Sequence, residues 1–391
     1  MRIDREYALA TLARLVQINS INPTLAPGAP GEREISEFIA GSLAVSGLTV
    51  EVFEPEPGRS SVVGRLAGTG GGRTLMLNAH SDTVDVAGMA EPFSGQIRDG
   101  KLYGRGAYDM KGSLAACMAA AKSLVDSGTR LRGDLLVTAV ADEEYGSLGT
   151  RDLIQRLKVD GAIVTEPTAL EICLAHKGYL WIEVEVTGRA AHGSRFELGL
   201  DANMKMGQFL AHLSRLERDL RSRSPHPLVG PPSLHAATLS GGTGLSTYAA
   251  SSKVRIERRT VPGETAERAV EEIQKIVDAL SKADPDFHAT VRPFFVRNPF
   301  EVSEDAAIVQ ALDRAVLKVR GQAAAHLGDT PWMDSALLQE AGVETVVCGA
   351  AGTGAHANIE WVDVGSVVKL AEILAEAAID YCGSIKLSRY S

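Results

Sequence analysis

Apolar residues in the chain before Gly178 follow two alternating patterns, one helical and one extended. Amphipathic periodicity predicts helices over residues 4–18 and 32–45, and an alanine-rich stretch that is apolar on all sides predicts a buried helix over 110–125. The runs TLMLNA, LLVTAV and GAIV are nearly continuously apolar, as strands covered on both faces should be. This alternation predicts an α/β domain with a mixed, mostly parallel sheet sandwiched by helices.

From Gly178 the pattern changes, because YLWIEVEVT alternates between apolar and polar residues, as in a strand with one solvated face. The elements that follow are predicted at residues 200–220, 234–240, 253–259, 264–280 and 287–295. Their order is strand, helix, strand, strand, helix, strand, which is the split βαβ arrangement of a two-layer, ferredoxin-like α+β domain.

The α/β pattern resumes after this segment, with predicted helices over 304–319 and 364–381 around the buried run TVVCGA. We therefore expect one discontinuous α/β domain, formed by residues 1–177 and 297–391, and an inserted domain over residues 178–296.

Composition and charge narrow the functional classes. The 391 residues are 45% hydrophobic and 23% charged, which is typical of a globular protein. A net charge of −9 argues against nucleic-acid binding, which needs a basic face. Charges interrupt MRIDREYALATLARL, and no run approaches the roughly 18 apolar residues of a membrane span, so we expect a cytoplasmic protein without membrane contact. The cysteines are widely spaced and predict buried thiols: Cys117, Cys173, Cys348 and Cys382.

Polar side chains capable of binding a metal or moving a proton follow several of the apolar runs. Strand ends that are distant in sequence converge at one edge of an open α/β sheet, so these side chains are expected to meet. A further carboxylate, in RGAYDMKG, lies where a glycine-rich loop enters the buried helix. The candidates are His80, Asp109, Asp142, Glu143, Glu144, Glu166 and His356.

Two imidazoles and several carboxylates at one place favour a pair of divalent cations, which removes the repulsion between the carboxylates. Mixed histidine and carboxylate ligands without cysteine suit catalytic zinc, with cobalt or manganese as substitutes. Each residue alone also fits a structural role, His80 as a hydrogen-bonded histidine and the DEE run as solvated surface. The recurrence at separate strand ends favours the metal site.

The motifs NAHSDTV, RGAYDMKG, DEEYGS, TEPT and GAHANIEWV resemble the co-catalytic dizinc aminoacylase family. This family includes acetylornithine deacetylase, succinyl-diaminopimelate desuccinylase and glutamate carboxypeptidase, and the resemblance covers essentially the whole chain. It implies that Asp109 bridges two zinc ions, with His80 and Glu166 on one and Glu144 and His356 on the other. It also implies that Asp82 orients the His80 imidazole and that Glu143 is the general base and acid.

For the inserted domain the resemblance implies a lid that also forms a homodimer. His192 in AAHGS matches a histidine that reaches the partner subunit's site and stabilises the oxyanion. Arg258 in IERRTVPGE matches a lid arginine that holds the substrate carboxylate. Backbone N–H groups of Gly352 and Gly354 are expected to face an anionic end of the substrate.

Two segments depart from the common family pattern. The run SGGTGLSTYAASS lacks the asparagine and proline that many members have after Gly-Gly, and it looks most similar to the acetylornithine-deacetylase-like branch. In TPWMDSALL, Asp334 and Ser335 stand where the family has a supporting acid.

The sequence therefore predicts a dizinc amidohydrolase that cleaves an N-acyl amino acid with a free carboxylate. A dipeptidase or carboxypeptidase with the same metals is the alternative, and a non-catalytic binding protein on the same fold is a more remote one.

Overall fold

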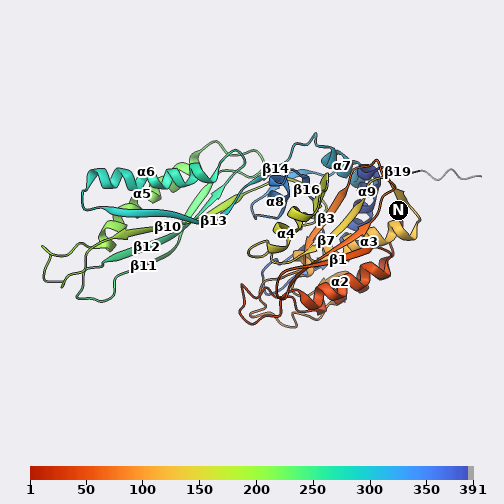
Figure 1. The fold of residues 1–391 in the computed structure, drawn as a ribbon, viewed down its shortest axis with the longest axis horizontal. Coiled ribbons are helices and arrows are strands. Elements are labelled where there is room, and N and C mark those ends of the chain that lie inside the picture. Colours follow the sequence, from red (N-terminus) through yellow and green to blue (C-terminus); the bar gives the residue numbers. More distant parts are fainter. Residues whose placement is uncertain (386–391) are drawn as a thin grey trace, which may run out of the picture. The chain divides into compact units, whose positions relative to one another are not determined.

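A computed structural model describes residues 1–385, and they fall into two compact units (Figure 1). The first unit contains Met1–Leu174, Val302–Leu327 and the chain from Met333 onward. The second unit contains Ala175–Glu301 and the short segment Gly328–Trp332. This short segment lies within the range that the sequence analysis assigned to the α/β domain.

A mixed sheet forms the centre of the first unit, and its strands are, in spatial order, β1 (Thr49–Glu56), β2 (Arg59–Leu66), β7 (Leu135–Val140), β3 (Leu75–His80), β8 (Gly161–Val164), β16 (Glu344–Val347) and β9 (Ile172–His176). The two-residue strand β14 (Phe300–Glu301), just before the chain returns to the first unit at Val302, pairs with β9. β7, β3, β8 and β16 run parallel, and antiparallel strands extend the sheet at both edges. A ninth strand, β15 (His326–Asp329), pairs with β9. The predicted mixed α/β fold is confirmed.

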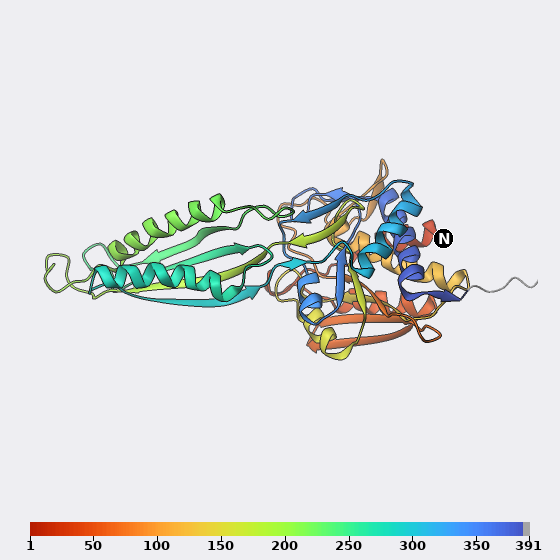
Figure 2. The same cartoon turned by 90° about the horizontal axis from the view of Figure 1, so that it is seen from above.

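Helices cover this sheet, and their bounds are α1 (Arg5–Gln17), α2 (Arg33–Val45), α3 (Gly112–Asp126), α4 (Leu148–Arg156), α7 (Ala307–Arg320), α8 (Ser335–Glu340) and α9 (Val364–Cys382) (Figure 2). The alanine-rich α3 packs against α9 and against β3 and β7. Small side chains allow this close approach, and β3 and β7 are buried along their whole length, as strands with helices on both faces should be. α1 and α9 begin at capping aspartates, Asp4 and Asp363, whose side chains accept backbone N–H groups of the first turn.

Short strands complete the first unit: β4 (Gln96–Arg98), β5 (Lys101–Tyr103), β17 (Gly352–Thr353) and β18 (Trp361–Asp363) form one small sheet, and β6 (Arg130–Leu131) pairs with β19 (Ser384–Ile385). The predicted helix over 110–125 is preceded by a π-type turn, Ala107–Lys111, inside which Asp109 and Met110 have non-helical backbone angles. The regular helix therefore starts only at Gly112, and Asp109 lies in the irregular turn before it.

The second unit is a two-layer α+β domain with the strands β10 (Gly178–Thr187), β11 (Ser233–Gly241), β12 (Ser251–Thr260) and β13 (His288–Arg297) and the helices α5 (Ala202–Ser222) and α6 (Ala266–Ala283). Its sheet is antiparallel, with the order β11-β12-β10-β13. Alternate residues of β10, such as Leu180 and Ile182, pack with Phe209 of α5 and Ile273 of α6 in one core. Both helices contact the sheet and each other, as the ferredoxin-like pattern predicts.

Among the described residues, no helix is both long enough and apolar enough to cross a membrane.

Candidate metal centre

The carboxyl ends of three neighbouring parallel strands bring polar side chains together in the first unit. His80 is the last residue of β3, Glu143 and Glu144 follow β7, and Glu166 follows β8. Because β7, β3 and β8 are adjacent and parallel, these residues emerge at the same edge of the sheet.

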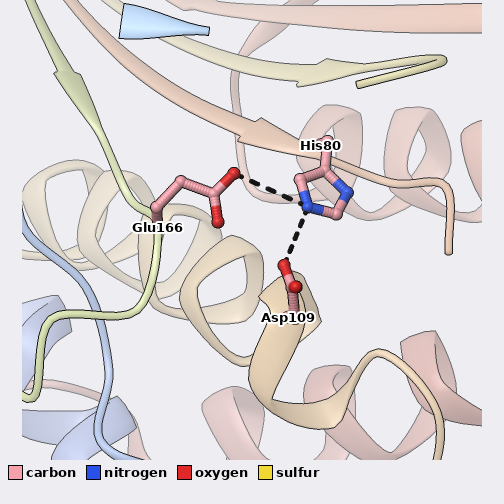
Figure 3. A group of neighbouring side chains, drawn as sticks. All are labelled: His80, Asp109 and Glu166. Atoms are coloured by element: carbon pink, nitrogen blue, oxygen red, sulfur yellow. Dashed lines mark hydrogen bonds and ion pairs between the residues drawn. The ribbon is translucent and has the colours of Figure 1, made fainter. Parts of the chain in front are cut away.

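His80, Asp109 and Glu166 form one group whose potential ligand atoms all lie within 4.8 Å of one another (Figure 3). The Nε2 atom of His80 lies 3.1 Å from Oδ1 of Asp109 and 3.6 Å from Oε1 of Glu166. His80 is only 2% exposed, and Glu166 is also buried. One imidazole nitrogen and two carboxylates from different elements thus converge on one point.

Asp109, Glu144 and His356 form a second group with the same spacing of potential ligand atoms. The Nε2 atom of His356 lies 3.0 Å from Oε2 of Glu144 and 3.5 Å from Oδ2 of Asp109. Asp109 therefore directs one oxygen toward His80 and the other toward His356. A carboxylate shared in this way suits a bridge between two cations.

The electrostatics of the site also fit bound cations. Burial raises the pKa of Glu166 and of Glu143 well above the ordinary value, and neighbouring carboxylates raise both further. Hydrogen bonds that the His356 imidazole donates to the carboxylates of Asp109 and Glu144 raise its pKa to about 10. Burial alone would raise the pKa of Asp109, but the two imidazoles outweigh it and lower that pKa. Burial and mutual repulsion thus disfavour the charged forms of Glu143 and Glu166, and a nearby divalent cation would favour these charged forms instead.

Asp82 lies between the His80 strand end and the Glu143 loop and is fully buried. Its Oδ1 accepts the backbone N–H of Glu143 at 3.1 Å, and its Oδ2 accepts that of Glu144 at 3.3 Å. The Nδ1 atom of His80 lies 3.0 Å from the carbonyl oxygen of Asp82 and 3.6 Å from its carboxylate. The nearest partner of the imidazole is therefore the backbone of Asp82, while the carboxylate mainly holds the Glu143–Glu144 loop.

Glu360 positions the Asp109 turn, a role that the sequence analysis did not foresee. Its buried carboxylate accepts the backbone N–H groups of Gly106, Tyr108 and Asp109 at 2.9–3.1 Å, and Nη1 of Arg105 donates to it at 2.7 Å. These bonds satisfy backbone N–H groups at the start of the turn, where a helix cannot supply partners of its own. Glu360 belongs to the motif GAHANIEWV, so the sequence marks it as a residue of interest, but the sequence does not show which N–H groups it binds.

The remaining predicted residues of the first unit have local structural roles. Gly352 pairs with Val362 in a small sheet, and Gly354 has φ +94°, where a Cβ would meet the carbonyl oxygen of Ile359 at 2.0 Å. Both positions therefore require glycine for packing, and their contact with a substrate stays a prediction. Asp334 is buried, accepts a hydrogen bond from Oγ1 of Thr150 and raises the pKa of Glu143, as expected for a neighbouring acid.

His192 and Arg258 belong to the second unit. His192 is exposed on a loop, where its Nδ1 atom lies 2.8 Å from Oγ of Ser194. Arg258 is only 1% exposed, and its Nη2 atom lies 2.7 Å from Glu264 and 3.3 Å from Glu272. This guanidinium is paired with two carboxylates of its own unit, and its contact with a substrate stays a prediction.

Arg259, the next residue of β12, lies on the opposite face of the strand. Its side chain is 32% exposed, its Nε atom donates to Glu257 at 2.8 Å, and its guanidinium lies 4.8 Å from the centre of the Tyr179 ring. The two arginines differ because successive side chains of a strand point to opposite faces.

Comparisons with known proteins agree with this fold. Residues 76–380 match the peptidase family M20/M25/M40. The acetylornithine deacetylase of Myxococcus xanthus is 28% identical over 387 residues, which cover 96% of this chain and 97% of that enzyme. The N-formyl-4-amino-5-aminomethyl-2-methylpyrimidine deformylase of Bacillus subtilis (strain 168) is 28% identical over 396 residues, which cover 93% and 92%.

One similar solved structure is the Bacillus subtilis YXEP protein, described as a dinuclear metal binding peptidase from the M20 family. The TM-score is 0.76 at 15% sequence identity, with 97% of this chain and 99% of that chain covered. The similarity of fold extends over both units.

Proposed function

Because the chain belongs to peptidase family M20/M25/M40 and is a metal-dependent amide hydrolase, we propose that it cleaves the amide bond of an N-acyl amino acid with two bound zinc ions. The observation that carries this proposal is the placement of Asp109, whose two oxygens face two separate sets of ligand atoms. A donor set of two imidazoles and three carboxylates suits catalytic zinc, and cobalt or manganese would suit the same donors.

Two divalent cations at this site would lower the pKa of water and polarise the amide carbonyl. Glu143 belongs to neither ligand group, and its backbone is fixed by Asp82 next to the ligand Glu144. It is therefore placed to take a proton from the attacking water and to return it to the leaving amine. This route needs no covalent intermediate with the protein.

The proposed substrate has an N-acyl group and a free carboxylate, which follows from the relationship to acetylornithine deacetylase over nearly the whole chain. The test is a hydrolysis screen with N-acetylornithine, N-succinyl-diaminopimelate, other N-acyl amino acids, free-amino dipeptides and the N-formyl aminopyrimidine of the related deformylase. Preferential hydrolysis of N-acyl amino acids supports the proposal. Preferential hydrolysis of dipeptides favours a peptidase instead.

A non-catalytic binding protein is the remaining alternative, and the site argues against it. All five proposed ligands and Glu143 are present, and the ligand atoms converge. Purified protein that holds well under two metal ions per chain and hydrolyses none of these compounds would support the binding protein.

We propose that Arg259, rather than Arg258, binds the substrate carboxylate. Arg258 is buried and paired with Glu264 and Glu272, whereas Arg259 lies on the opposite face of the strand and keeps 32% of its side chain exposed. Replacing Arg259 with Leu is expected to raise KM about 10- to 100-fold, since a hydrogen bond to a charged group contributes about 1.5–3 kcal/mol. The unfolding free energy of the Arg259→Leu variant should differ little from that of the wild type. Steady-state kinetics on the best substrate of the screen measures the effect.

The matched variant is Arg258→Leu, which leaves Glu264 and Glu272 without this partner. It is expected to lower the unfolding free energy by about 1–3 kcal/mol, less than for a fully buried pair because both glutamates retain some solvent contact. Denaturant unfolding measures this loss. If Arg258→Leu raised KM at unchanged stability and Arg259→Leu did not, the assignment would be reversed.

We further propose a homodimer formed through the second unit, with His192 acting in the partner's site. Strand β11 is an edge of its sheet, is exposed from His235 to Gly241, and carries Leu239 at 58% exposure. These features suit pairing with a second copy.

Light scattering is expected to show a dimer, and the substitution Leu239→Glu should shift the protein toward monomer with loss of activity. Val45→Glu, at an exposed position of the first unit, is the control. A fully active monomer would contradict both the dimer and the role of His192.

A further inference from the structure

A buried polar network in the first unit centres on Arg59, the first residue of β2. Its Nε and Nη2 atoms donate to the two carboxylate oxygens of Glu32 at 2.7 and 2.8 Å. Nη2 also donates to Oδ1 of Asp142 at 2.9 Å. The planar guanidinium thus holds one carboxylate with two bonds and reaches a second carboxylate with the same nitrogen.

Asn22 extends this network toward the metal centre. Its Nδ2 atom donates to Oδ1 of Asp142 at 2.9 Å and to Oδ2 of Asp82 at 2.8 Å. Asp82 in turn accepts the backbone N–H groups of Glu143 and Glu144. A continuous series of hydrogen bonds therefore joins Arg59 to the backbone of the proposed base and of one proposed ligand.

Asp142 is the point at which the chain leaves β7 and turns into the Glu143–Glu144 loop. Its φ of +69° lies in the left-handed region, which residues other than glycine rarely adopt. Its carbonyl oxygen accepts N–H groups from Tyr145 and Gly146, and its side chain is held by Arg59 and Asn22. An unfavourable backbone conformation persists only where the surroundings fix it, and here Arg59 and Asn22 do so.

We propose that Arg59, held in place by Glu32, is a positioning residue that fixes the turn at Asp142 and thereby the direction of Glu143 and Glu144. A lysine at this position keeps the charge but lacks the planar fork that bonds Glu32 and Asp142 together. This inference rests on the proposed metal-dependent function, because its effect is exerted on the base and on a metal ligand.

The test compares wild type with Arg59→Lys and Glu32→Gln in the full-length chain, stripped of metal and titrated with Co²⁺. Both variants are expected to bind Co²⁺ about 10- to 100-fold more weakly at one of two positions, with an altered visible absorption spectrum, as for lost outer partners of metal ligands. With saturating metal, kcat on the best substrate of the screen should fall by a similar factor while KM stays within about twofold. The double variant should be little worse than either single one, since the two residues act as a unit.

Arg33→Lys is the matched control, because Arg33 is the neighbour of Glu32 and pairs with Glu54 at the surface, with side-chain exposures of 58% and 37%. It should leave both Co²⁺ affinity and kcat unchanged. If Arg59→Lys and Glu32→Gln lower the melting temperature but keep wild-type Co²⁺ affinity and kcat, their role is only structural and this inference is overturned. Wild-type protein that binds no Co²⁺ would overturn the proposed function itself.

Discussion

Replacing Glu143 with Gln is expected to lower kcat by about 10²–10⁴-fold, the usual contribution of a general acid–base group, while two metal ions stay bound. The amide of glutamine keeps the size of the side chain but cannot accept a proton from water. Metal binding should persist because Glu143 belongs to neither ligand group, and the bond from its backbone N–H to Asp82 does not depend on the side chain. Steady-state kinetics together with elemental analysis of the purified protein measures both quantities.

The adjacent residue provides the matched comparison. Glu144→Gln makes the same chemical change one position along the loop, but Glu144 lies 3.0 Å from His356 within the second ligand group. This variant is therefore expected to lose metal as well as activity, and added metal should restore part of its rate. Near wild-type turnover of Glu143→Gln with metal bound would rule out the proposed mechanism. Equal metal loss in both variants would mean that Glu143 is a ligand.

The convergence of these potential ligand residues could be predicted from the sequence, because most of them follow continuously apolar runs. The run TLMLNA ends at His80, and the structure ends β3 at the same residue. Parallel strands place their carboxyl ends at one edge, so a polar residue after each run is enough to indicate a common site. Asp109 does not follow an apolar run, and it was predicted instead from the glycine-rich loop in front of the buried helix.

Residues that hold the site in place could not be identified in this way. Glu32 is the residue at which the helix over 32–45 was expected to begin, and Arg59 lies at the start of a strand, so each looks locally ordinary. Their partners are 27 to 83 residues apart in sequence, and only the folded chain brings them together. Glu360 is similar, because its bonds reach a turn more than 250 residues away.

The strand faces of Arg258 and Arg259 could be predicted from the sequence. Val254 and Ile256 are the apolar residues of this strand, and Arg258 continues their two-residue period toward the buried face. Alternation therefore assigns Arg259 to the opposite face, where its side chain keeps solvent contact.

The proposed bridging role of Asp109 predicts a distinctive pattern of metal loss. Outer partners of metal ligands each contribute about 10- to 100-fold to metal affinity, so the loss of a direct ligand shared by two ions should exceed about 100-fold at both positions. Asp109→Asn is the suitable change, because it keeps the side-chain shape and the backbone bonds to Glu360. It is expected to leave the enzyme essentially inactive, with neither ion retained after dialysis.

Two variants, each altered in only one of the two ligand groups, test whether Asp109 binds both ions or only one. Glu166→Gln affects only the group with His80, and Glu144→Gln affects only the group with His356, so each should weaken one of two binding events in a Co²⁺ titration. Asp109→Asn should weaken both events together, since its Oδ1 faces His80 and its Oδ2 faces His356. If Asp109→Asn weakened one event and left the other at wild-type affinity, Asp109 would be a ligand to one ion only, and the two groups would be independent sites.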